Sequence, residues 1–144
     1  MKEMKIEFYD ELPAQAAKIR TAVFVEEQGF EEEFDDLDLI ARHAVLYLDG
    51  APAGTCRYFV REGEWTLGRF ALLPQFRGTG AGRALLRAAE GDILSRGGFK
   101  VNIFAQCRAR GFYEKCGYLP TGRTGEEQGC PHLFMEKILS GGAE

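Results

Sequence analysis

The sequence predicts an α/β fold in which helices flank a mixed central β-sheet. Two observations predict it: three apolar strand patterns separated by tight turns (44–48, 53–61 and 65–73), and an amphipathic helix (80–96) followed by another strand (100–105). A strand–helix–strand unit places its two strands parallel with a right-handed crossover, whereas the tight turns make antiparallel pairs. The 144 residues suit one domain, so we expect residues 1–144 to fold as a single unit.

The first part of the chain predicts a strand and then a helix. Residues 5–9 alternate between polar and apolar side chains, which is typical of a strand. Residues 12–27 carry apolar side chains at helical spacing, Pro13 suits a first helical turn, and Gly29 suits the end of the helix. The acidic residues 30–38 that follow are expected to form a solvated loop or a short helix.

The middle of the chain predicts an antiparallel meander and then a helix. Asp49-Gly50 is a strong hairpin signal between the first two strands, and residues 62–64 mark a second turn. The helix over residues 80–96 has an apolar stripe and ends at Gly97-Gly98.

The last part of the chain predicts a short helix over residues 108–115 and two final strands, 118–120 and 132–138. We expect a Gly-rich loop over residues 121–130 to join these strands. The elements together form an α/β sandwich around a mixed sheet.

Composition excludes several function classes. A net charge of −4 makes the chain a poor nucleic-acid partner, because such binding depends on clustered positive charge. The charged start leads into no apolar signal region, and no apolar run approaches the ~20 residues of a membrane span. The four cysteines form no C-x-x-C pair, and with only two histidines a metal site is not expected. We therefore expect a cytoplasmic protein with reduced thiols, no metal and no membrane partner.

A glycine cluster over residues 73–83 carries the main chemical signal. It follows a strand and opens a helix, and Gly78 and Gly80 permit backbone conformations in which several N–H groups converge on an anion. The helix N-terminus adds positive potential, and Arg77 and Arg83 add charge, so a pyrophosphate fits. The Rossmann and Walker A patterns both fail, because Arg83 replaces the third glycine and no Gly-Lys-Ser/Thr follows. A plain Gly-rich turn is the alternative interpretation.

The pattern that does match is Q/R-x-x-G-x-G/A, filled by Gln75, Gly78 and Gly80. At this point the chain resembles the GNAT superfamily of acetyl-coenzyme A-dependent N-acetyltransferases. Residues 112–118 resemble the superfamily's motif F-Y-x-x-x-G-F/Y, and residues 69–74 resemble the strand whose backbone pairs with the pantetheine arm. The order of elements also agrees over the whole chain.

A narrower resemblance is to the ElaA/YjcF-like branch. It depends on residues 23–28, on the acidic run leading to His43, and on residues 129–132, where Cys130 stands in place of a usual aliphatic residue. Gln106 stands where the superfamily often has Asn, and Gln can make a similar hydrogen bond.

The resemblance implies the GNAT (acyl-CoA N-acyltransferase) fold and acetyl-CoA as cosubstrate, without a metal. It implies an amine acceptor, either a small molecule or a peptide. The oligomeric state stays open between a monomer and a homodimer. The residues that it places at the cofactor are Phe70, Ala71, Leu72, Gln75, Arg77, Gly78, Thr79, Gly80, Ala81, Gly82, Arg83, Gln106, Phe112 and Tyr113.

The resemblance also implies direct attack of the amine on the thioester. Tyr113 is then expected to protonate the leaving thiolate, and a backbone N–H within residues 70–72 to stabilise the oxyanion. His132 and His43 are candidate bases, each with a purely structural role as the alternative. Cys107 is expected to be a buried thiol and not an acyl carrier.

Four further residues are expected at the acceptor amine: Glu27, Gln28, Asp36 and Arg69. Glu27 and Gln28 end the first helix, where the family keeps its acceptor loop, and the acidic run would attract a cationic amine. A solvated acidic surface is the alternative. Two other functions stay open: a non-catalytic module that binds acyl-CoA, and a nucleotide-binding protein that uses the same glycines.

Overall fold

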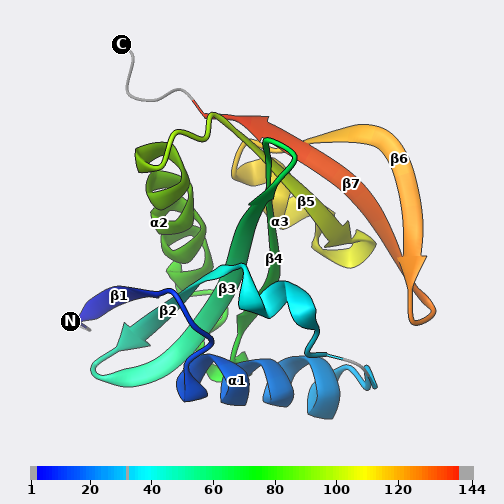
Figure 1. Cartoon of the computed structure of the whole chain (residues 1–144). Helices are drawn as coiled ribbons and strands as arrows, with labels where there is room; N and C mark the ends of the chain where they lie inside the picture. The colour runs from blue at the N-terminus through cyan, green and yellow to red at the C-terminus, as the bar shows by residue number, and fades with distance from the viewer. Residues whose placement is uncertain (1–2, 32, 140–144) are drawn as a thin grey trace.

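The computed structural model describes residues 3–31 and 33–139, and within them one mixed seven-stranded sheet has the order β1-β2-β3-β4-β5-β7-β6 (Figure 1). Only β4 and β5 run parallel, and the other neighbours are antiparallel. The predicted α/β class is confirmed. The strands are β1 (Met4–Tyr9), β2 (Arg42–Leu48), β3 (Ala51–Arg61), β4 (Glu64–Leu72), β5 (Lys100–Gln106), β6 (Leu119–Glu127) and β7 (Cys130–Ile138).

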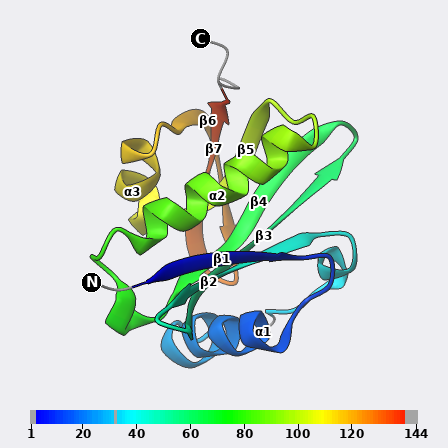
Figure 2. The same cartoon turned by 90° about the vertical axis from the view of Figure 1, so that its left-hand side faces the viewer.

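Helices cover both faces of this sheet (Figures 1 and 2). Alternation along β2 divides the core, because Ala44 and Leu46 pack toward α2 (Ala81–Ser95), whereas Val45 packs toward α1 (Ala14–Arg20). The remaining helical segments are η1 (Thr21–Glu27), η2 (Asp36–Leu39), η3 (Pro74–Phe76), η4 (Cys107–Ala109) and α3 (Arg110–Lys115).

Three sequence predictions need correction. The helix expected over residues 12–27 begins at Ala14, and its second half, η1, is a π-helix. Both helix types bury one side, so a pattern of apolar residues over seven positions does not separate them. The long loop expected over residues 121–130 is wrong, because β6 extends to Glu127 and turns at Gln128-Gly129. Cys107, expected to be buried, is exposed in η4.

The missed strand β6 is an edge strand. Nearly all of its side chains are exposed, and it pairs with β7 through the backbone. It therefore lacks the apolar alternation that reveals a half-buried strand in a sequence. Gln128 and Gly129 have positive φ angles of 48° and 80°, as Asp49 and Gly50 do in the predicted hairpin, which suits two-residue turns between twisted strands.

The parallel strands β4 and β5 separate toward their carboxyl ends. They are in register only from Trp65 to Leu67 on β4, opposite Val101 to Ile103 on β5. Beyond this point β4 bulges, since two residues, Arg69 and Phe70, occupy the place of one on β3. Arg69 takes a positive φ of 48° in the bulge. The bulge and the separation open a gap in the middle of the sheet.

No helix in the described part of the chain is long and apolar enough to cross a membrane.

Candidate active site

A pocket of about 980 Å³ occupies the region where β4 and β5 separate. At one end it reaches the glycine turn before α2, and at the other end it reaches the tip of the β6–β7 hairpin. Most of the predicted site residues line it. Of the adjacent pair Glu27 and Gln28, only Gln28 lines it. The other predicted residues that line it are Arg69, Phe70, Ala71, Leu72, Arg77, Gly78, Gly80, Gly82, Arg83, Gln106, Phe112, Tyr113 and His132.

The glycine turn forms an open backbone cradle at the start of α2. Gly78 and Gly80 have φ angles of +76° and +87°, and each faces open space where a Cβ would stand. Gly80 caps α2, so the positive end of the helix dipole points at the cradle. Among the hydrogen bonds within residues 3–31 and 33–139, none uses the N–H groups of Gly78, Thr79 or Gly80. These amides are free to bind an anion.

Three predicted cofactor residues in or beside this turn do not line the pocket: Gln75, Thr79 and Ala81. The Thr79 hydroxyl donates to the Phe76 carbonyl (2.7 Å) and accepts from the Ala81 N–H (3.3 Å), which fixes the turn. At Gly82 a Cβ would lie 3.1 Å from the Leu72 side chain, so the small residue lets α2 approach β4 closely.

Arg77 and Glu27 form a bidentate ion pair. The sequence analysis expected Arg77 at the cofactor and Glu27 at the acceptor amine. Nη1 and Nη2 of Arg77 each donate to one oxygen of the Glu27 carboxylate, both at 2.8 Å. The Arg77 Nε–H donates to the Leu72 carbonyl (3.0 Å). The hydrogen bond from Arg77 lowers the pKa of Glu27, so the pair is charged at neutral pH. It links the end of η1 to the glycine turn.

A second link lies at the next residue. The Gln106 amide donates to Gln28 Oε1 (2.9 Å), and its own carbonyl oxygen accepts from Arg108 Nε (2.7 Å). Gln28 therefore connects the end of η1 with the end of β5. Glu27, the last residue of η1, and its C-cap Gln28 thus connect this segment to the glycine turn and to β5.

Tyr113 lies in the pocket wall and is 6% exposed. Its ring packs edge-on against Phe70, Phe112 and Tyr118. Burial raises the pKa of Tyr113, so the phenol keeps its proton at neutral pH. Its hydroxyl makes no hydrogen bond to another group in the described residues, so it is available as a donor to a molecule in the pocket.

His132 lies at the other end of the pocket and is 4% exposed. Its Nδ1 lies 2.8 Å from the Cys130 carbonyl oxygen, and its ring stacks on Phe104 with 4.6 Å between centroids. The carbonyl can only accept, so Nδ1 carries the hydrogen and the Nε2 of the neutral ring is the acceptor. The geometry suits a base.

His43 and Asp36, the other predicted base and one predicted acceptor residue, do not line the pocket. His43 lies on β2, two strands away from the gap, where its Nε2–H donates to the Asp38 carbonyl (3.1 Å). Burial lowers the pKa of His43 and favours the neutral ring. Asp36 is exposed at the start of η2. The expected roles at the pocket are not supported for either residue.

Three residues of the acidic run, Glu33, Asp35 and Asp38, form ion pairs with arginines, whereas Asp36 is exposed to solvent. Asp38 accepts from Arg20 (2.8 Å) and Arg57 (3.0 Å), and Asp35 accepts from Arg57 (2.6 Å). Glu33 pairs with Arg20 and with Arg69. Arg20 and Arg57 are 1% and 4% exposed, so these pairs fasten the segment before β2 to the sheet.

The structure also brings residues to the pocket that sequence reasoning missed. Glu33, Asp35, Arg57, Glu127 and Phe104 also line the pocket. The one signal that pointed to buried pairing was an arginine, Arg20, in the apolar stripe of the first helix. Within the described residues no cluster of His, Cys, Asp or Glu is arranged to hold a metal ion.

Comparison with known proteins shows the family to which this chain belongs. The family model described as the acetyltransferase (GNAT) domain matches residues 10–139. YjcF of Bacillus subtilis, described as an uncharacterized N-acetyltransferase, is 34% identical over 122 residues, which cover 83% of this chain and 87% of YjcF.

Two solved structures are similar along nearly their whole length. The first, a Lactobacillus plantarum protein named as a candidate N-acetyltransferase, has a TM-score of 0.86 and 39% identity, over 94% of this chain and 98% of that one. Escherichia coli ElaA has a TM-score of 0.81 and 24% identity, over 95% and 99% of the two chains, and shares the fold. The chain therefore belongs to the GNAT family of acetyltransferases.

Proposed function

We propose that this protein transfers an acetyl group from acetyl-CoA to the primary amine of a small molecule or peptide. The observation that carries the proposal is the arrangement of the pocket: free backbone amides lie at one end, and a buried, protonated tyrosine lies in its wall. Acetyl-CoA carries an anionic diphosphate and, at the other end of its pantetheine arm, a reactive thioester carbonyl. The backbone amides suit the diphosphate, and the tyrosine suits the thioester.

The diphosphate would bind the amides between Gly78 and Gly82 at the start of α2. Arg83, Arg108 and Lys115 line the pocket and add positive charge on its open side. The separated part of β4, from Phe70 to Leu72, has no partner on β5 and, apart from the Leu72 carbonyl bound by Arg77, would offer its backbone to the amide groups of the pantetheine arm. The same strand would supply the N–H group that stabilises the oxyanion.

The chemistry needs alignment, removal of a proton from the amine, and a proton for the leaving thiolate. An alkylamine is mostly ammonium at neutral pH and cannot attack until it loses a proton. His132 Nε2 is the acceptor for that proton, and the Tyr113 hydroxyl is the donor to the thiolate. The amine attacks the thioester directly, so no residue of the chain is acetylated.

Two measurements test this proposal in sequence. Isothermal titration with acetyl-CoA, CoA and ATP separates an acyl-CoA site from a nucleotide site, and we expect heat with the first two only. Release of free thiol is then followed over a panel of primary amines. Binding of acetyl-CoA without amine-dependent thiol release across the panel would instead support a non-catalytic binding module.

A further inference from the structure

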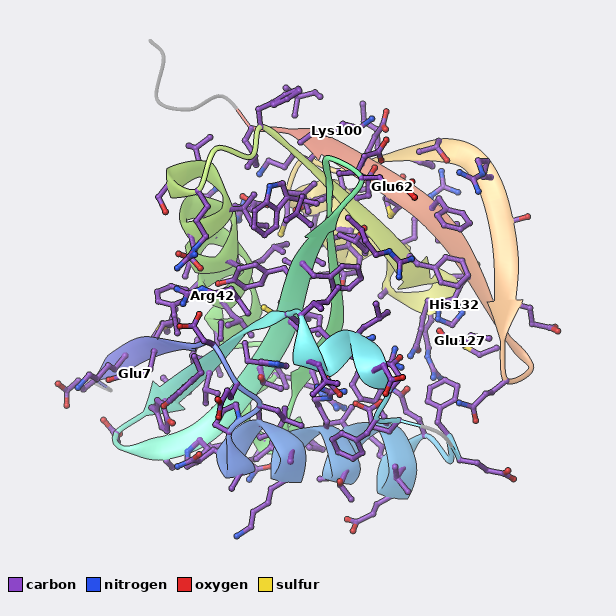
Figure 3. The ribbon with its side chains drawn as sticks, in the orientation of Figure 1. Glu7, Arg42, Glu62, Lys100, Glu127 and His132 are labelled. Atoms are coloured by element: carbon purple, nitrogen blue, oxygen red, sulfur yellow. The ribbon has the colours of Figure 1, made fainter. Side chains whose placement is uncertain are left out.

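The acceptor end of the pocket contains an imidazole nitrogen and a carboxylate that face each other without a direct hydrogen bond. His132 Nε2 and Glu127 Oε1 lie 3.7 Å apart on neighbouring strands of the β6–β7 hairpin (Figure 3). A direct N–H···O bond would need about 3 Å. Both atoms belong to residues that line the pocket, so a third group can reach both.

His132 presents an unused acceptor to the pocket. Because Nδ1 donates to the Cys130 carbonyl, the Nε2 of the neutral ring holds the lone pair. Stacking on Phe104 fixes the plane of the ring. Nε2 makes no hydrogen bond to any group in residues 3–31 and 33–139, although the side chain is only 5% exposed. His132 lines the pocket, so a ligand there can supply the donor that Nε2 lacks.

The negative charge of Glu127 is less compensated by neighbouring arginines than the charges of Glu33 and Asp35, the other carboxylates of the pocket. Glu33 and Asp35 both accept short hydrogen bonds from arginines. The nearest cation to Glu127 is Arg69 Nη1 at 3.9 Å, and Arg69 already donates to the Glu33 carbonyl (3.0 Å) and to Asp35 (3.3 Å). The Glu127 side chain is 41% exposed and faces the pocket, so its oxygens can accept from a ligand.

We propose that the acceptor binds as a protonated primary amine whose ammonium group donates to Glu127 and His132 Nε2 at once. This proposal rests on the acetyltransferase function proposed above and assigns an acceptor site to it. An ammonium group has three donors and a full charge, so it satisfies both atoms and compensates Glu127. A hydroxyl or a neutral amide leaves the carboxylate uncompensated. Glu127 thus selects a cationic amine, and His132 activates it.

The proton balance follows from this placement. One N–H bond of the ammonium breaks and its proton moves to His132 Nε2, which becomes imidazolium. The neutral amine forms the C–N bond with the thioester carbonyl carbon, and the C–S bond breaks. The thiolate takes the Tyr113 proton, and the second proton lost by the amine nitrogen restores the phenol. His132 then releases its proton to solvent, so the net products are an amide, a thiol and one proton.

The first test measures binding and does not need turnover. Propylammonium is titrated into the CoA-bound protein while the ring signals of the two histidines are followed by NMR. We expect the His132 signals to move and those of His43 to stay, because only His132 lines the pocket. Glu127→Gln should weaken propylammonium binding about tenfold or more, as the loss of a charge-assisted hydrogen bond does.

A neighbouring residue provides the matched control. Glu126 is exposed on the same strand, on the opposite side from Glu127, and does not line the pocket. Glu126→Gln makes the same chemical change and should leave propylammonium binding unchanged. If propylammonium leaves the His132 signals of the wild type unmoved, or binds Glu127→Gln as well as wild type, the proposed site is wrong.

The second test separates the two residues by kinetics on the best amine of the thiol-release panel. Glu127→Gln should raise the amine KM, whereas His132→Gln should lower kcat about 10²-fold with a smaller change in KM. O-Methylhydroxylamine, which is uncharged at neutral pH, should lose no efficiency in Glu127→Gln. Equal losses for the charged and uncharged nucleophiles would overturn the charge-selection proposal. Failure of the wild type to bind acetyl-CoA would instead contradict the proposed function.

Discussion

The Glu27 carboxylate and the Arg77 guanidinium face each other as a bidentate pair, with both N···O distances at 2.8 Å. This pair joins the end of η1 to the turn that the diphosphate would occupy. Both side chains are well exposed, at 38% and 40%, so solvent and salt weaken their attraction. A diphosphate bound at this turn as proposed would therefore compete with Glu27 for the same guanidinium.

We expect Glu27→Gln to tighten acetyl-CoA binding by about twofold to fivefold at low salt, because Arg77 then offers its full charge to the diphosphate. Isothermal titration measures the effect. Glu26→Gln, an exposed neighbour on η1, is the control and should change nothing. Weaker binding in Glu27→Gln would mean that Glu27 acts by positioning Arg77 and not by competing for it.

Tyr113→Phe should leave acetyl-CoA affinity unchanged and lower kcat about 10²-fold, the usual contribution of one general acid. The substitution keeps the ring packing against Phe70, Phe112 and Tyr118 and removes only the hydroxyl. Steady-state thiol release gives kcat, and calorimetry gives the affinity. A variant with wild-type turnover would remove Tyr113 from the mechanism.

Gly80→Ala should weaken acetyl-CoA binding at least about tenfold, because a left-handed backbone costs an L-residue about 1–2 kcal/mol and the turn must shift to relieve it. The φ of +87° at Gly80 is the reason for the strain. Gly91 provides the opposite case, since it lies exposed within α2 with nothing within 4 Å of an added Cβ.

Gly91→Ala should therefore stabilise the protein by about 1 kcal/mol and leave binding unchanged, because alanine favours a helix interior. Urea unfolding measures the stability of both variants. Equal acetyl-CoA affinity in Gly80→Ala and wild type would contradict the role of the cradle.

The buried His43 side chain should make the free energy of unfolding depend on pH. Burial lowers its pKa in the folded state, whereas the unfolded state has the ordinary value near 6.5. Below that value the unfolded chain binds more protons than the folded chain, so the free energy of unfolding should fall as the pH drops from 7 to 5. His43→Gln should flatten this decline in urea unfolding curves. An identical slope in the variant would show that other groups cause it.

The glycine turn and Tyr113 could be predicted because their signals are local. Positive φ angles at Gly78 and Gly80 need glycine, so the residue type itself reports the backbone. Tyr113 follows from a short motif on one helix. The strands of the meander were equally visible, because one turn of two residues fixes each hairpin.

The rest of the site depends on contacts between distant segments. Arg57 pairs with Asp35 across 22 residues, and Arg69 reaches Glu127 from another strand. The spacing of apolar residues in the sequence does not reveal such ion pairs, since each charged partner alone resembles an ordinary surface residue. Glu127 was hidden further because β6 carries no apolar pattern.

The exposed strand β6 has a consequence for how this enzyme family can diversify. Its side chains contribute little to the core, so the strand that carries Glu127 tolerates replacement at small cost to folding. Gly82 and Tyr113, in contrast, pack tightly against the interior. With the acceptor amine bound at Glu127 as proposed, mutation could explore new acceptors along β6 while selection preserves Gly82 and Tyr113, and a change of amine specificity would not require a new scaffold.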